Sequence, residues 1–110
     1  MNNKSLTKIE IDLNAKSYGE LNEGYLSAFG AQIELLLKIM FGGFPRIPVS
    51  IRGTGSQIDT FIKTLSKEKR YMDAFNRHGL GDKRTFGSKY KLDSAVQNFE
   101  KTTGLAWPLK

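Results

Sequence analysis

The cationic residues of this chain are concentrated between Lys63 and Lys91. The chain has 17 Lys and Arg against 11 Asp and Glu, a net charge of +6. Nine cations and three acids fall in this one stretch, so it alone carries +6 and the rest of the chain sums to zero. A local positive field attracts phosphates, acidic proteins or anionic surfaces, whereas the plain alternative is a solvated face that keeps the protein soluble.

Aromatic residues are interleaved with these cations. Cations hold phosphates, and exposed rings stack on bases. We therefore expect phosphate contacts from six side chains of this stretch, namely Lys69, Arg70, Arg77, Lys83, Arg84 and Lys89. Stacking on a base is expected from Tyr71, Phe86 and Tyr90. In the alternative, the charge is only solvated and Phe86 and Tyr90 fold into the core.

A second candidate anion site is the turn Arg52-Gly53-Thr54-Gly55-Ser56. A strand, a Gly-rich turn and a helix start bring free backbone N–H groups together, and the helix dipole favours an anion there. Arg52 and the hydroxyls of Thr54 and Ser56 could add contacts. The turn has neither the Lys of a phosphate-binding Walker loop nor the third Gly of a dinucleotide fingerprint, so a plain capped turn is the alternative.

The residues of catalysis and metal binding are sparse. His78 is the only histidine, precedes Gly79 at a predicted helix end, and is interpreted as a C-terminal cap. The acids show no catalytic or metal-ligand spacing, and Asp73 and Asp82 are expected to orient arginines. There is no cysteine. We therefore predict a protein that is not an enzyme and holds no metal or cofactor.

Hydrophobic periodicity predicts an α+β fold with the order β-α-β-α-α, a small sheet packed against three helices in one domain over 1–110. Strands are expected at 9–13 and 47–51, parallel or antiparallel. Helices are expected at about 18–41, 56–78 and from 92 to 103, with a loop from 79 to 90. The apolar tail is expected to dock on the core through Trp107.

The second half of the first predicted helix is apolar on more than one side. This pattern around Leu35 to Phe41 favours a homo-oligomer. The longest apolar run is too short to cross a bilayer, so no membrane partner is expected. The start, Met1 to Ser5, lacks the apolar region of a signal peptide, and we expect a cytoplasmic protein.

The C-terminal part of the chain resembles small accessory proteins of tailed bacteriophages. The resemblance covers less than half of the chain and lies in Glu68–Met72, His78–Thr85, Leu92–Val96, Phe99–Glu100 and Thr103–Pro108. It defines no activity and transfers no site residue. It implies a phage protein in a bacterial cytoplasm, where such proteins often block host machinery or capture nucleotide immune signals.

The leading hypothesis from the sequence is therefore sequestration of a small nucleotide, cyclic immune signals included, by a basic pocket between protomers. The alternatives are a DNA- or RNA-binding module, and an inhibitor that docks its basic face on an acidic host protein. A nucleic-acid binder differs from a nucleotide pocket in the steep salt dependence of its affinity.

Overall fold

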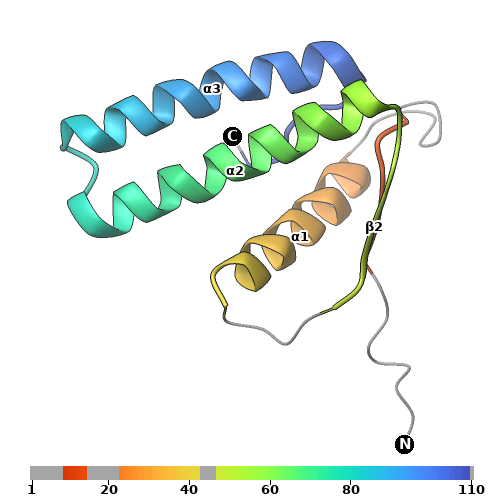
Figure 1. Ribbon diagram of the computed structural model, residues 1–110, viewed down its shortest axis with the longest axis horizontal. Helices are drawn as coiled ribbons and strands as arrows, with labels where there is room; N and C mark the ends of the chain where they lie inside the picture. The colour runs from red at the N-terminus through yellow and green to blue at the C-terminus, as the bar shows by residue number, and fades with distance from the viewer. Residues whose placement is uncertain (1–8, 15–22, 43–46, 110) are drawn as a thin grey trace, which may run out of the picture.

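The fold is α+β with the expected element order. In the computed structural model the described residues are 9–14, 23–42 and 47–109. They form β1 (Ile9–Asp12), α1 (Glu23–Met40), β2 (Val49–Arg52), α2 (Gly55–His78) and α3 (Lys83–Thr103). Figure 1 shows α2 and α3 side by side as one long hairpin, with α1 and the strands grouped toward one end of it. The predicted fold class and order are confirmed.

The two strands pair in parallel, one of the two arrangements that the sequence left open. Ile9 lies opposite Val49, and Asp12 lies opposite Arg52. In β1 the alternation works as expected, because Ile9 and Ile11 are buried while Glu10 between them is exposed. The strand predicted from residue 47 is assigned from Val49, although the carbonyl of Pro48 already accepts the N–H of Ile9 at 2.8 Å.

The segment 79–90 is the place where the sequence prediction is wrong. Only Gly79 to Gly81 and the capping Asp82 separate the helices, and α3 begins at Lys83 rather than near Leu92. Asp82 caps α3 by accepting the Arg84 N–H at 2.8 Å. The density of Gly and charge favoured a loop, but one Asp N-cap and a Gly79 with φ of 82° suffice for a tight turn.

Side-chain hydroxyls fix the register of the α2–α3 hairpin. Thr64 donates to the Ala95 carbonyl at 3.1 Å, and Thr85 donates to the Ala74 carbonyl at 3.2 Å. These two bonds pair the middle of α2 with the middle of α3, and the end of α2 with the start of α3. The helices are therefore antiparallel.

The core is an aromatic cluster that the C-terminal tail completes. Phe29, Phe61 and Phe99 surround Trp107, whose ring meets Phe99 edge to face at a centroid distance of 5.2 Å. Trp107 is 1% exposed, and its indole N–H donates to the buried carboxyl of Glu68 at 3.0 Å. The predicted docking of the tail through Trp107 is confirmed.

Two predicted helix starts have different outcomes. Ser17 and Glu20 have the spacing of a capping box and predict a helix start, but both lie outside the described residues, as do the other residues of 18–22. Ser56 followed by Asp59 predicts a capped start for the second helix, but the capping residue is Thr54. Thr54 accepts the Gln57 N–H at 3.1 Å, and the Gln57 side chain accepts the Thr54 N–H at 2.9 Å. This reciprocal pair is a capping box with Gln at its third position.

Candidate functional site

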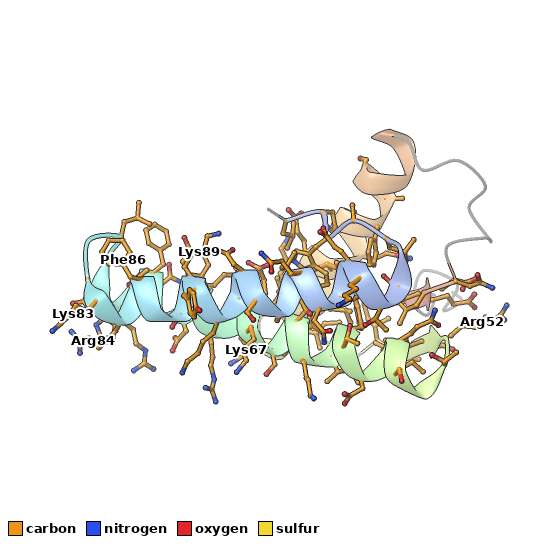
Figure 2. All side chains as sticks on the ribbon, turned by 90° about the horizontal axis from the view of Figure 1, so that it is seen from above. Arg52, Lys67, Lys83, Arg84, Phe86 and Lys89 are labelled. Atoms are coloured by element: carbon orange, nitrogen blue, oxygen red, sulfur yellow. The ribbon has the colours of Figure 1, made fainter. Side chains whose placement is uncertain are left out.

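The hairpin distributes the cations of 63–91 over two opposite sides. Figure 2 shows Lys67 and Arg84 on the side away from α1, and Lys89 on the side where α1 lies. We call the side away from α1 the outer face. It carries a groove between α2 and α3, the outer groove, with a volume of about 550 Å³. Its lining residues are Thr60, Lys63, Thr64, Lys67, Tyr90, Lys91, Ser94, Ala95 and Asn98.

Two ammonium groups without a carboxylate partner face this groove from its two walls. Lys67 comes from α2 and Lys91 from α3, and neither forms an ion pair among the described residues. Lys63 is the third lysine of the groove, and Asp59 holds it at 3.2 Å one helical turn away. Both side chains of this ion pair are exposed, so the pair contributes little to stability and Lys63 can bind another anion instead.

The floor of the groove holds a polar atom that lacks a partner. Thr60 is only 6% exposed, and its hydroxyl is buried with no hydrogen bond among the described residues. The neighbouring Thr64 hydroxyl, by contrast, is satisfied by the Thr60 and Ala95 carbonyls. A buried hydroxyl without a partner costs free energy, which a ligand oxygen in the groove would recover.

A ring is available beside these cations. Tyr90 lines the groove and is 77% exposed, so the alternative prediction that Tyr90 folds into the core is wrong. Phe86, at 62% exposure, is also outside the core, but Figure 2 shows it on the α1 side. Tyr71 is half-buried, with the Lys89 ammonium 5.9 Å from its ring centre. Of the three rings expected to stack on a base, Tyr90 is the one that lines the outer groove.

Helical periodicity extends the basic row beyond the groove. Arg70 and Arg77 follow Lys63 and Lys67 at spacings that keep all four on one side of α2. From Lys63 to Arg77 the axis rises about 21 Å, at 1.5 Å for each residue. Arg70 has no carboxylate partner among the described residues, whereas Arg77 is held by Asp73 at 3.2 Å.

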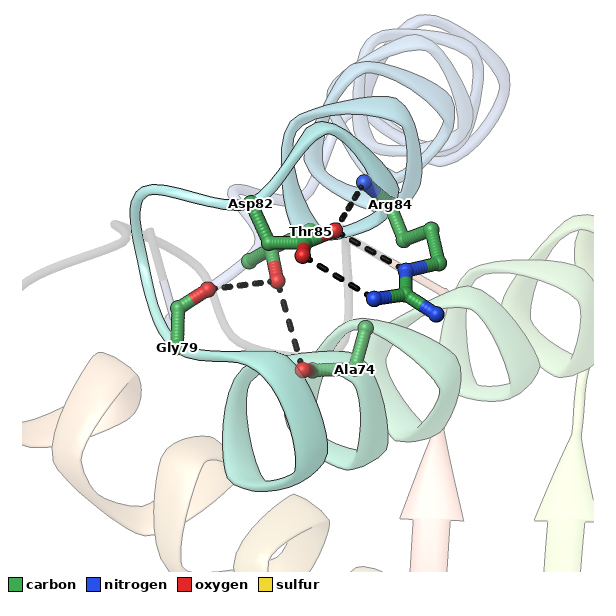
Figure 3. A network of polar contacts seen from close by, with 5 residues as sticks. All are labelled: Ala74, Gly79, Asp82, Arg84 and Thr85. Carbon is green, nitrogen blue, oxygen red and sulfur yellow. Dashed lines mark hydrogen bonds and ion pairs between the residues drawn. The ribbon is translucent and has the colours of Figure 1, made fainter.

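The expected pairing of arginines with Asp73 and Asp82 is confirmed. The Arg84 guanidinium donates two hydrogen bonds to the Asp82 carboxylate, of 2.9 and 3.0 Å (Figure 3). This hydrogen bonding lowers the pKa of the Asp82 carboxyl far below its usual range and raises the pKa of Arg84. Arg84 thus stabilises the N-terminal cap of α3, and its guanidinium is bound to Asp82 rather than available to a ligand.

The remaining predicted phosphate contacts lie elsewhere. Lys89 binds Asp93 at 2.7 Å on the α1 side, and this bond raises the pKa of the lysine. The Lys69 ammonium lies 4.8 Å from the centre of the Phe41 ring, next to α1. Lys83, free of carboxylates among the described residues, lies at the hairpin tip. The six cations proposed from the sequence therefore do not converge on one point.

The Gly-rich turn is remote from the hairpin tip. Figure 2 shows Arg52 at one end of the molecule, with Lys83 and Arg84 at the other. The capping box of Thr54 and Gln57 already occupies backbone N–H groups that would hold an anion, while Ser56 is exposed. This arrangement favours the plain capped turn over a second phosphate site.

Sequence reasoning did not include Thr60, Lys67, Lys91 and Ser94 among the site residues. The paired acids were readable in advance, because Asp59–Lys63, Asp73–Arg77 and Lys89–Asp93 are all spaced i,i+4. The position of Lys67 across the groove from Lys91 could not be predicted, since it depends on the register of a hairpin whose 79–90 segment had been predicted as a loop.

Catalytic and metal-binding constellations are not found in the part of the chain described here. No three His, Asp or Glu side chains gather there in a way that could hold a metal ion. His78 lies in the last turn of α2, before the capping N–H of Gly79, which donates to the Phe75 carbonyl at 2.9 Å. No helix among the described residues is long and apolar enough to cross a membrane.

Comparison of the chain with protein-family models, curated proteins and solved structures found no match. We therefore infer the function from the geometry of the outer face.

Proposed function

We propose that this protein binds, without catalysis, a phosphate-bearing ligand on the outer face of the α2–α3 hairpin, and that a nucleic-acid strand is the ligand it suits best. The observation that carries the proposal is the outer groove, where Lys67 and Lys91 lack carboxylate partners and flank the exposed ring of Tyr90. Ammonium groups contact phosphates, and the ring offers a stacking surface to a base.

The length of the basic row favours a strand over a single nucleotide. The row from Lys63 to Arg77 covers about 21 Å. One strand of a duplex places a phosphate every ~3.4 Å of axis, so the row can contact several phosphates in succession. A small nucleotide was the first choice from sequence because the charge was concentrated in one helix and an expected loop, and because the apolar first helix favoured a site between protomers. With 83–90 helical, the cations of this segment belong to a straight helix beside the row on α2, rather than to a loop that could close around a small ligand.

A small nucleotide is the second candidate, and one observation favours it. The outer groove has a volume of about 550 Å³, within the range of small-molecule sites, and its floor holds the unpartnered Thr60 hydroxyl. For either ligand, the proposal includes the setting that the C-terminal resemblance implies, which is a bacteriophage protein in a bacterial cytoplasm.

The test is fluorescence anisotropy with a labelled 20-nucleotide single-stranded DNA over a salt series. We expect binding at low salt whose logarithm falls linearly with the logarithm of salt concentration. Replacing both lysines, as Lys67→Glu with Lys91→Glu, should weaken binding at least tenfold and reduce the slope by about 1.4, at ~0.7 for each lost phosphate contact. Tyr90→Ala should weaken it by about tenfold through lost stacking.

The matched control is Lys38→Glu with Lys69→Glu, which changes the net charge equally but on the α1 side, where Lys38 lines a different cavity and Lys69 lies over the Phe41 ring. Equal losses in both double variants would mean that net charge alone attracts DNA, and the proposed site would be wrong. Thermal shift with ATP and with a cyclic dinucleotide tests the second candidate. A shift that Lys67→Glu removes, without DNA binding, would favour the nucleotide.

A further inference from the structure

The distal half of the hairpin exposes three large apolar side chains. Phe75, Leu80 and Phe86 are each between 44% and 62% exposed. Each of them directly follows one of Ala74, Gly79 and Thr85. The Thr85 hydroxyl donates to the Ala74 carbonyl at 3.2 Å and to the Gly79 carbonyl at 2.7 Å, so these three residues lie close together. The three therefore gather at one end of the hairpin. Figure 2 shows Phe86 on the α1 side there, beyond the reach of α1.

An apolar cavity lies next to these residues, between α1, α2 and the C-terminal tail. We call it the inner cavity. Its volume is about 600 Å³, and it is lined by Glu34, Leu37, Lys38, Phe41, Glu68, Met72 and Leu109. Phe75 is about one turn beyond Met72, so the apolar surface continues from the cavity along α2 toward the tip.

We propose that this surface is the interface between two copies of the chain, with Phe86 of each copy inserted into the inner cavity of the other. A protruding ring and an apolar cavity on one face make that face self-complementary, as a two-fold interface requires. A buried aromatic anchor in a pocket is also the usual centre of binding energy in an interface. The proposal does not depend on the function proposed above.

The area is that of a small dimer interface. Phe41, Phe75, Leu80 and Phe86 each expose on the order of 100 Å². Together with the partly buried Met72 and Leu109, they amount to about 500 Å² for one copy and about 1,000 Å² for two, the lower limit of a specific interface. A single copy would leave this apolar surface in water.

The charges at the two contact regions are complementary. Lys83 at the tip and Glu34 at the rim of the cavity are both without an ion-pair partner among the described residues. When the tip of one copy enters the cavity of the other, the ammonium approaches the carboxylate, which favours this register over a shifted one. The outer groove of each copy stays open to ligand, because it lies on the opposite side of the hairpin.

Sedimentation equilibrium of the full chain tests the interface. We expect a dimer at tens of micromolar, and Phe86→Glu should weaken the dimer at least thirtyfold. The matched control is Ile62→Glu, which alters an exposed apolar residue about 20 Å before Phe75 along the α2 axis and about 140° away around it. A monomeric wild-type chain at several hundred micromolar, or equal effects of the two variants, would overturn the proposal.

Two further measurements keep the result specific. Lys83→Glu should weaken the dimer several-fold, and adding Glu34→Lys should restore it, since the pair is then reversed. The sequence has no cysteine, so chains carrying Phe86→Cys can be mixed with chains carrying Leu109→Cys. We expect disulfide-linked heterodimers in excess over either homodimer. Heterodimers in no excess would show that Phe86 does not enter the partner's cavity.

Discussion

Removing the Trp107 ring should cost this protein a large part of its stability. The ring is 1% exposed and packs on Phe29, Phe61 and Phe99. At about 25 cal/mol for each Å², the ~200 Å² of a Trp side chain corresponds to ~5 kcal/mol. Since alanine retains part of this burial and the cavity relaxes in part, we expect Trp107→Ala to cost about 4 kcal/mol.

The loss of the indole N–H adds a polar contribution. Glu68 is 5% exposed, and its carboxyl accepts the Trp107 Nε1 hydrogen at 3.0 Å. Trp107→Phe keeps most of the apolar contact and leaves the buried carboxyl short of a donor, which should cost about 1–3 kcal/mol. A chain of 110 residues has a free energy of unfolding of roughly 5–16 kcal/mol, so both losses are measurable.

Urea denaturation followed by far-ultraviolet circular dichroism is the suitable assay, because tryptophan fluorescence is lost in both variants. Tyr90→Ala, at an exposed position, is the control and should change the free energy of unfolding by less than ~0.5 kcal/mol. If Trp107→Ala is unfolded in water, Trp107→Phe still gives the measurement. A loss below ~1.5 kcal/mol for Trp107→Ala, or none for Trp107→Phe, would refute the assigned role of the tail.

Two other predictions concern single residues. Burial raises the pKa of the Glu68 carboxyl, so the folded state binds more protons than the unfolded state, and stability from this group falls as pH rises above about 4.3. Thermal melts at several pH values should show Glu68→Gln gaining stability relative to wild type as pH rises; a constant difference would contradict this. Gly87 lies inside α3 with open space around its Cβ position, so Gly87→Ala should stabilise by about 0.5–1 kcal/mol in urea denaturation. Gly53→Ala is its counterpart and should destabilise, because the new Cβ would lie 2.9 Å from the Gln57 side-chain oxygen and 3.2 Å from the Leu13 Cβ.

The site was only partly predictable. The sequence located the charge within 63–91 and placed Lys63, Lys67 and Arg70 on one side of a helix, and Lys63 and Lys67 do line one groove. It could not say that Lys69 would meet Phe41 or that Lys89 would lie beside Tyr71. Those contacts join elements distant in sequence, and helical periodicity gives no information about which element lies opposite.

The order of strands and helices, the fold class, the apolar stripes and the position of the net charge were determined by the sequence itself, because period and composition are local properties. The tertiary structure decided the parallel pairing of β1 and β2, the short turn at Asp82 and the facing of Lys67 and Lys91 across the outer groove. These depend on contacts between distant segments, above all on the Thr64–Ala95 and Thr85–Ala74 bonds that set the hairpin register. Whether a row of cations faces solvent, a carboxylate or an aromatic ring is fixed by packing, and packing is a property of the whole chain.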